Sequence, residues 1–154
     1  MGLEIERKFL VDAAIVAELR DGEYICQGYI PTQTKTAVRV RIKGTNAFLT
    51  LKGENRGAVR TEYEYPIPVD DAKSILSDLC LGPKIEKTRY TITVANHVWE
   101  LDLFHGDNEG LIVAEVELSN EQEHVELPDW VTEEVTDDAR YYNVNLLNNP
   151  YKAW

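Results

Sequence analysis

The chain of 154 residues is 44% hydrophobic and 28% charged, a composition that excludes a disordered chain and predicts one domain over residues 1–154. Its net charge of −11 argues against nucleic acid and anionic membranes as partners. No apolar run is long enough for a transmembrane helix and no signal peptide is recognisable, so we expect a cytoplasmic protein.

The first predicted element is a strand over residues 2–11. Its alternating pattern places two acids and a base on one face, with apolar residues on the other. A short helix is expected over residues 12–22, with Asp12 as N-cap and Gly22 as its stop. Further strands then follow in quick succession over residues 24–30, 37–44, 47–53 and 60–67, separated by Gly, Asn and Pro.

The second half of the chain begins with a predicted helix over residues 69–83, which the Gly82-Pro83 pair ends. Strands are predicted over residues 85–94, 97–104 and 111–118, and a final helix over residues 136–148. Eight strands and about three helices in one domain indicate an α+β fold. We expect a closed or nearly closed eight-stranded antiparallel β-barrel, with the helices packed outside it.

One face of these strands is charged along nearly the whole barrel, and its acids and bases are equal in number. The acids are Glu4, Glu6, Glu62, Glu64, Glu100, Asp102, Glu115 and Glu117, and the bases are Lys8, Arg39, Arg41, Lys43, Lys52, Arg60, Lys87 and Arg89. The two sets cancel, so the net charge of −11 lies on the rest of the chain. Because unpaired ions cost several kcal/mol to bury, the charged lumen must hold water, a metal or a polyanion.

Clusters of acids and bases in one cavity have a natural common ligand, which is a divalent metal carrying a phosphate chain. Carboxylates bind Mg²⁺ or Mn²⁺ through oxygen, while Arg and Lys bind phosphate oxygens. The sequence contains neither a Walker loop nor a GxGxxG motif, so backbone amides do not cradle the phosphate. The pattern predicts phosphoryl chemistry with Mg²⁺ or Mn²⁺ as the cofactor.

The chain resembles the CYTH domain, or triphosphate tunnel metalloenzyme, superfamily. Its segment "EIERK" (4–8) fits the ExExK signature, and "QGYI", "VRVR", "TLKG", "RTEYEYPI", "EKTRY", "ELDLF" and "VAEVEL" follow in order. The segment "EEVTDDARYYN" (133–143) is similar to the C-terminal part of the short bacterial members, whose last helix lies near the tunnel mouth. The resemblance covers essentially the whole chain, so residues 1–154 would form a single CYTH domain. It implies an eight-stranded tunnel that hydrolyses or binds triphosphates with a divalent metal.

The resemblance also implies site residues. The implied metal ligands are Glu4, Glu6, Glu115 and Glu117. The implied phosphate-binding bases are Lys8, Arg39, Arg41, Lys52, Lys87 and Arg89. A further group of tunnel acids either holds a second metal or positions these bases, and consists of Glu62, Glu64, Glu100 and Asp102.

The implied catalytic residues are Lys8, Tyr29 and Glu6. Tyr29 matches a tyrosine that acts together with the signature lysine, here Lys8, and its alternative interpretation is a tyrosine of the barrel wall. Four other bases are set apart from these roles. Arg60 and Lys43 share the inner face but lie near strand ends, whereas Lys84 and Arg56 lie in loops.

The expected function is metal-dependent hydrolysis of inorganic triphosphate to pyrophosphate and phosphate, because the compact length resembles the short bacterial triphosphatase branch. Alternatives in the same family are a class IV adenylyl cyclase and a thiamine triphosphatase. A non-catalytic module that binds polyphosphate or nucleotide would need the bases but not the paired carboxylates. An open sheet that binds a basic protein would leave the bases unexplained. The expected partner is a small-molecule triphosphate, and a homodimer is left open.

Overall fold

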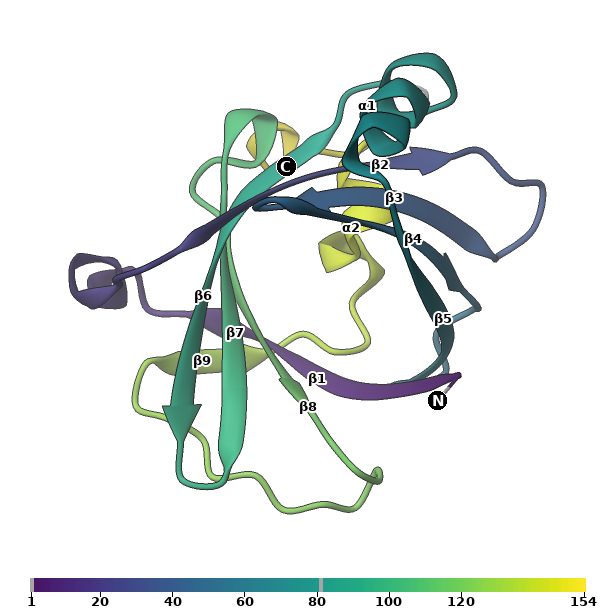
Figure 1. Ribbon diagram of the computed structural model, residues 1–154. Helices are drawn as coiled ribbons and strands as arrows, with labels where there is room; N and C mark the ends of the chain where they lie inside the picture. Colours follow the sequence, from purple (N-terminus) through teal and green to yellow (C-terminus); the bar gives the residue numbers. More distant parts are fainter. Residues whose placement is uncertain (1, 81) are drawn as a thin grey trace.

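The computed structural model describes residues 2–80 and 82–154, and within these residues nine strands form one sheet (Figure 1). The strands are β1 (Leu3–Val11), β2 (Glu23–Ile30), β3 (Ala37–Lys43), β4 (Asn46–Lys52), β5 (Val59–Ile67), β6 (Ile85–Val94), β7 (His97–Phe104), β8 (Ile112–Glu117) and β9 (Val131–Glu134). Their order is β5-β4-β3-β2-β6-β7-β8-β1-β9, and an additional pairing joins β5 to β1. That pairing closes the first eight strands into an antiparallel barrel, which confirms the predicted fold.

Strand β1 closes the barrel because it has partners on both edges. Its residues Glu6–Leu10 pair with β8 on one edge, and Leu3–Ile5 pair with β5 on the other. Further along, Phe9 and Val11 pair with β9, with a register shift between them. Strand β9 thus extends the wall where β5 no longer follows β1. The sequence analysis missed this strand because four residues are too few to establish an alternating pattern.

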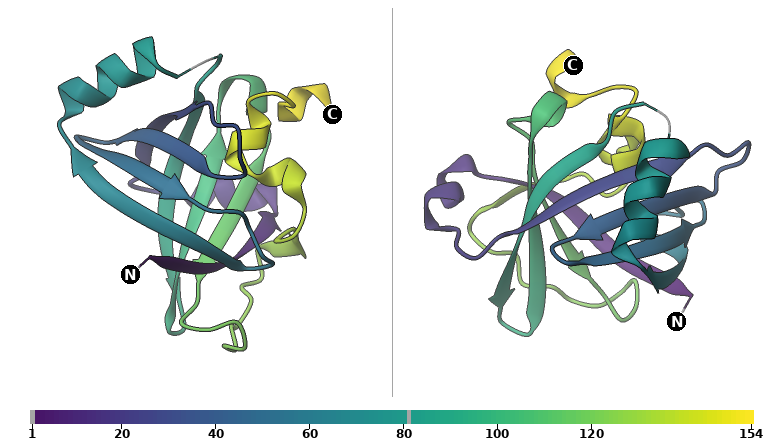
Figure 2. Two further views of the ribbon diagram at one scale, coloured as in Figure 1. Left: turned by 90° about the vertical axis from the view of Figure 1, so that its right-hand side faces the viewer. Right: turned by 45° about the horizontal axis from the view of Figure 1, so that its top comes forward.

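Two apolar clusters cover the outside of the barrel. One lies under helix α1 (Val69–Asp78), where Ala72 and Leu76 pack on the outer face of the sheet beside Val40. The other is built around Trp99 and Phe9, with the 3₁₀ helix η1 (Ala13–Glu18) packed against it through Ile15. The two further views (Figure 2) show α1 lying across the outside of the barrel, as predicted. These faces account for the apolar half of the strand alternation.

A third apolar cluster closes one end of the barrel from within. Ile85, Phe104 and Val113 follow the same alternation as the charged residues of their strands, and they contact Tyr141 and Leu146 of the C-terminal segment. Figure 1 shows helix α2 (Asn143–Leu146) within the ring of strands, and Figure 2 places it at one end of the barrel. The C-terminal segment therefore brings side chains and carbonyl groups to the lumen.

The helices are shorter than the sequence predicts. Residues 12–22 form only the six-residue η1, although Asp12 caps it as expected by accepting a hydrogen bond from the Ala14 amide. The predicted helix over residues 136–148 is broken into η3 (Ala139–Tyr141) and α2, because Tyr142 between them is extended. The 3₁₀ helices η2 (Gly106–Asn108) and η4 (Tyr151–Ala153) complete the fold. None of the described helices has the length and apolar character needed to cross a membrane.

Candidate active site

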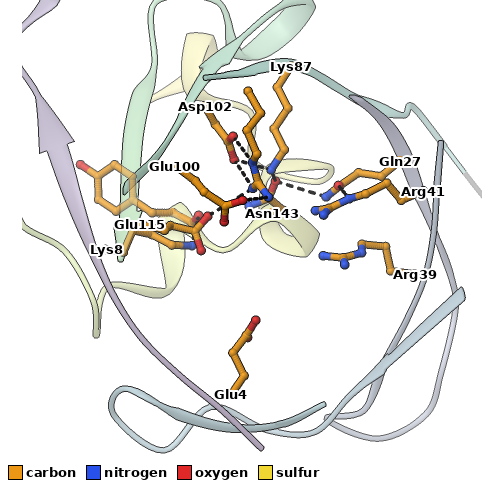
Figure 3. A network of polar contacts seen from close by, with 12 residues as sticks. Glu4, Lys8, Gln27, Arg39, Arg41, Lys87, Glu100, Asp102, Glu115 and Asn143 are labelled. Atoms are coloured by element: carbon orange, nitrogen blue, oxygen red, sulfur yellow. Dashed lines mark hydrogen bonds and ion pairs between the residues drawn. The ribbon is translucent and has the colours of Figure 1, made fainter. Parts of the chain in front are cut away.

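The barrel holds a cavity of about 230 Å³ with a strongly charged wall. Among the described residues, eight basic and six acidic side chains line it. The bases are Lys8, Arg39, Arg41, Lys43, Lys52, Arg60, Lys87 and Arg89, and the acids are Glu4, Glu6, Glu62, Glu64, Glu100 and Glu115. The alternation in the sequence therefore does converge on one space, and Figure 3 shows several of these side chains pointing into it from all sides.

Glu6 and Glu115 form a close carboxyl pair on the neighbouring strands β1 and β8. Burial raises the pKa of Glu6 well above its ordinary value. The charge of Glu115 and a hydrogen bond with Glu115 raise this pKa further. For Glu115, burial favours the neutral form, but the charge of Lys8 and the hydrogen bond from Glu6 hold its pKa well below the ordinary value. Of the pair, Glu6 is therefore the member that holds a proton more readily, and Glu115 is the member that ionises first.

Glu4 lies near this pair and contacts Lys52. The Lys52 Nζ is 3.3 Å from Glu4 Oε1 and 3.2 Å from Glu62 Oε2. Burial raises the pKa of Glu4 above its ordinary value, although the ammonium of Lys52 opposes the shift. One lysine thus holds two carboxylates at this part of the wall.

Each remaining tunnel acid is paired with a base. Glu62 contacts Lys52, as described, and Glu64 Oε2 is 3.4 Å from Arg39 Nη2. Glu100 Oε2 is 3.4 Å from Arg89 Nη1. Asp102 contacts two bases, with 2.6 Å between its Oδ2 and Lys87 Nζ and 2.7 Å between its Oδ1 and Arg89 Nε. The register of β6 and β7 explains this arrangement, because Arg89 and Asp102 are directly opposite each other.

Asp102 differs from the other tunnel acids because it is buried behind the bases and does not line the cavity. Burial alone would favour its neutral form, but the charges of Arg89 and Lys87 lower its pKa to about 2. Asp102 is therefore ionised at neutral pH and acts as the counterion of two cations.

The bases repel one another. Burial lowers the pKa of Lys87 to about 7, with Asp102 opposing the shift and Arg89 adding to it. Burial and the charges of Arg39 and Arg89 lower the pKa of Arg41 to about 9. The Nε of Arg39 is buried and has no hydrogen-bond partner among the residues that the structure describes. A polyanion in the cavity would relieve the repulsion among these bases.

One implied metal ligand, and two bases that were set apart from the site, lie differently from the expectation. Glu117 shares the inward alternation of Glu115, but it is the last residue of β8, is exposed, and does not line the cavity. The physical reason is that the pairing of β8 with β7 ends at Val116, so the next side chain reaches solvent at the rim. Conversely, Lys43 and Arg60 do line the cavity despite their positions near strand ends.

Tyr29 and Lys8 both line the cavity, but they have different partners. The Tyr29 hydroxyl accepts a hydrogen bond from Gln27, whereas Lys8 Nζ donates to the Tyr141 carbonyl and lies 5.5 Å from the centre of the Tyr142 ring. Within the described residues no hydrogen bond joins Lys8 to Tyr29. Their joint action stays a prediction.

Sequence reasoning missed two polar residues of the site, Gln27 and Asn143. Gln27 is fully buried on the inner face of β2, and Asn143 lines the cavity from α2. Asn143 Oδ1 accepts hydrogen bonds from Lys87 Nζ at 2.9 Å and from Gln27 Nε2 at 3.2 Å. The position of Gln27, two residues before Tyr29 on a strand, is the signal that could have revealed it.

The carboxylates fit a metal ion that binds together with a phosphate chain. In residues 2–80 and 82–154, no three His, Cys, Asp or Glu side chains come close enough to form a metal site of their own. Mg²⁺ usually takes only one or two carboxylates and completes its shell with water and substrate phosphate oxygens. The pair Glu6 and Glu115, with Glu4 nearby, supplies such oxygen donors beside the basic wall.

Comparison with known proteins identifies the family. The model of the CYTH domain matches residues 2–146. An inorganic triphosphatase of Acetivibrio thermocellus is 47% identical over 152 residues, which cover 99% of this chain and 97% of that protein. An inorganic triphosphatase of Nitrosomonas europaea is 40% identical over 151 residues, covering 93% and 95% of the two chains. A crystal structure of an inorganic triphosphatase, 36% identical over 93% of this chain and 96% of that one, superposes with a TM-score of 0.65. The chain therefore belongs to the CYTH domain family.

Proposed function

We propose that this protein hydrolyses inorganic triphosphate to pyrophosphate and phosphate with the help of a divalent metal ion. The observation that carries the proposal is the cavity, where a basic wall large enough to surround a short phosphate chain adjoins a carboxyl pair. The two relatives named inorganic triphosphatase, at 47% and 40% identity, support this choice of substrate over the cyclase and thiamine triphosphatase alternatives.

In this proposal the bases bind the phosphate chain. The phosphate-binding residues are Lys8, Arg39, Arg41, Lys52, Lys87 and Arg89. Their cationic groups point into a partly enclosed space, where charge on the phosphate oxygens is neutralised without reorganisation of water. Arg41 and Lys87 gain most from the anion, since burial and mutual repulsion disfavour their charged forms in the free protein.

The carboxylates Glu4, Glu6 and Glu115 would hold Mg²⁺ or Mn²⁺. When bound, such an ion neutralises phosphate charge and lowers the pKa of a coordinated water molecule. A bound ion would favour the ionised form of Glu6, whose pKa is raised in the free protein, and Glu115, whose pKa is held low, is the other member of the pair.

The remaining tunnel acids act by positioning bases. Glu62, Glu64 and Glu100 each contact a base of the wall, and Asp102 contacts Lys87 and Arg89 from behind. These ion pairs support the positioning role of the four acids, and their alternative role as ligands of a second metal stays a prediction. Tyr29 faces the cavity and is proposed to donate its hydroxyl hydrogen to the substrate.

The test is phosphate release from inorganic triphosphate, ATP and thiamine triphosphate with Mg²⁺ or Mn²⁺, with cyclic AMP measured in parallel. We expect inorganic triphosphate to give the highest kcat/KM and no cyclic AMP to form. Arg41→Ala should raise KM, whereas Arg20→Ala, which removes an exposed arginine just after the end of η1, should not. Cyclic AMP formation, or binding of triphosphate without turnover, would contradict the proposal. Light scattering coupled to size-exclusion chromatography tests whether the protein is a homodimer, which the sequence leaves open.

A further inference from the structure

Gln27 is the centre of a buried hydrogen-bond network behind the cavity wall. Its side chain is fully buried on β2, and its Oε1 accepts a hydrogen bond from Arg41 Nε at 2.7 Å. Its Nε2 donates to Tyr29 Oη at 3.0 Å and to Asn143 Oδ1 at 3.2 Å. Figure 3 shows the contacts of Gln27 with Arg41 and Asn143. Both protons of the amide and its carbonyl oxygen therefore have partners, although Gln27 itself does not line the cavity.

The chemistry of the partners allows only one orientation of this amide. The guanidinium of Arg41 has donors and no acceptor, so the carbonyl end of Gln27 must face it. The amino end then faces Tyr29, and the phenol oxygen is the acceptor of that hydrogen bond. A phenol that accepts from its neighbour keeps its own hydrogen free to donate elsewhere. Because Tyr29 lines the cavity, that hydrogen is available to a ligand there.

The same amide also connects two further elements of the site. Asn143 Oδ1, which accepts from Gln27, also accepts from Lys87 Nζ at 2.9 Å. The network thus joins Tyr29 on β2, Arg41 on β3 and Lys87 on β6 to the C-terminal segment. A change in the hydrogen-bonding character of Gln27 alters the surroundings of these groups without touching the cavity.

We propose that Gln27 is a positioning residue of the reaction, an inference that rests on the proposed function. Its amide holds the phenol of Tyr29 so that the hydroxyl hydrogen is donated to a phosphate oxygen of the bound triphosphate. It also fixes Arg41 through Nε, which leaves the two terminal nitrogens of the guanidinium free for the phosphate chain. Gln27 acts through these two side chains and makes no contact with the substrate.

The test is a double-mutant cycle of Gln27→Glu with Tyr29→Phe. A carboxylate at this position still accepts from Arg41, but it also accepts the hydroxyl hydrogen of Tyr29 and so withdraws it from the substrate. We expect Gln27→Glu to lower kcat by roughly tenfold to a hundredfold, the effect of losing one hydrogen bond to a charged group. The added negative charge weakens triphosphate binding in both backgrounds, so the cycle cancels that contribution.

The expected result is strong non-additivity. In the Tyr29→Phe background, Gln27→Glu should lower kcat by a much smaller factor, because no hydroxyl hydrogen is left to misdirect. An equal loss of kcat in both backgrounds would overturn the inference, and so would wild-type kcat in Tyr29→Phe. Gln27→Met, a neutral variant of similar size, goes through the same cycle and should lose less than Gln27→Glu. Circular dichroism and melting temperature check that each variant folds.

Failure of the proposed function is distinguishable from failure of this inference. Wild-type protein that releases no phosphate from triphosphate contradicts the proposed function alone. The cycle is then measured on the dissociation constant of inorganic triphosphate by isothermal titration calorimetry, because donation from Tyr29 also contributes to binding. Non-additive dissociation constants support the role of Gln27 in orienting Tyr29, and additive ones overturn it.

Discussion

Lys87 Nζ lies 2.6 Å from Asp102 Oδ2, and the two side chains are only 1% and 2% exposed. Asp102 does not fully neutralise Lys87, because Asp102 also forms an ion pair with Arg89 and the guanidinium of Arg41 lies nearby. Burial, aided by these two cations and opposed by Asp102, lowers the pKa of Lys87 to about 7. A lysine of the cavity wall therefore titrates in the neutral range, and any anion bound beside it favours its charged form.

The first prediction is proton uptake when triphosphate binds. At pH 8 Lys87 is mostly neutral in the free protein, and a bound triphosphate should raise its pKa and protonate it. Calorimetric titrations without metal, in two buffers of different ionisation enthalpy, measure the number of protons taken up. Lys87→Met should remove much of this uptake, whereas Lys73→Met, at an exposed position of α1, should retain it. Equal uptake in the two variants would contradict the assignment to Lys87.

The second prediction concerns stability against pH. The folded-state pKa of Lys87, about 7, lies below the ordinary value of 10.5, so between these pH values the unfolded chain binds more protons. The free energy of unfolding contributed by Lys87 therefore rises with pH across this window, and its burial penalty is largest below pH 7. The free energy of unfolding of Lys87→Met, measured by urea unfolding and compared with that of wild type at the same pH, should be relatively highest at pH 6.5 and relatively lower at pH 9.5. A difference that does not change with pH would argue against a depressed pKa.

The third prediction is that triphosphate compensates for the loss of Asp102. Asp102→Asn leaves Lys87 and Arg89 buried without their shared counterion, which costs about 3–5 kcal/mol of unfolding free energy. A bound triphosphate replaces the missing negative charge, so it should stabilise the variant more than wild type. Urea unfolding with and without triphosphate measures both effects. Asp138→Asn, which alters an exposed ion pair with Arg140, serves as the matched control and should change little.

Much of this fold follows from the alternation of side chains. A charged inner face and an apolar outer face recur in most of the strands, so strand positions and a charged lumen could be predicted from the sequence. The elements that were missed depend on tertiary contacts. Strand β9 has four residues, and its pairing with β1 forms where β5 diverges from that strand. The break at Tyr142 allows the Tyr141 carbonyl and Asn143 to reach Lys8 and Lys87.

The charged residues of the site could be predicted from the sequence, whereas the neutral Gln27 and Asn143 could not. Counting acids and bases found Lys87 and Asp102, but not their contact, because the pairing depends on how β6 and β7 are aligned. Gln27 and Asn143 are neutral and contribute nothing to a charge count, although they connect the bases. Residue alternation also cannot tell where a wall ends.

Glu6 and Glu117 provide the sharpest test of the proposed metal ligands. They are directly opposite each other on β1 and β8, and alternation assigns both to the inner face. In the structure Glu6 lines the cavity, whereas Glu117 is exposed at the rim and does not. The same Glu→Gln substitution at the two positions therefore compares a proposed ligand with a matched control.

Glu6→Gln should abolish turnover at low metal and raise the Mg²⁺ concentration for half-maximal rate by about tenfold to a hundredfold, the effect of losing one charged ligand. The variant should nevertheless fold with a melting temperature close to that of wild type. The reason is that burial and the charge of Glu115 raise the pKa of Glu6 and so favour its protonated form, and a glutamine has the shape and charge of that form. Glu117→Gln should leave both the rate and its Mg²⁺ dependence unchanged. Phosphate release across a Mg²⁺ titration, after chelator treatment, measures these quantities. Wild-type Mg²⁺ dependence in Glu6→Gln would refute its role as a ligand, and an equal loss in Glu117→Gln would mean that the metal binds at the rim instead of inside the barrel.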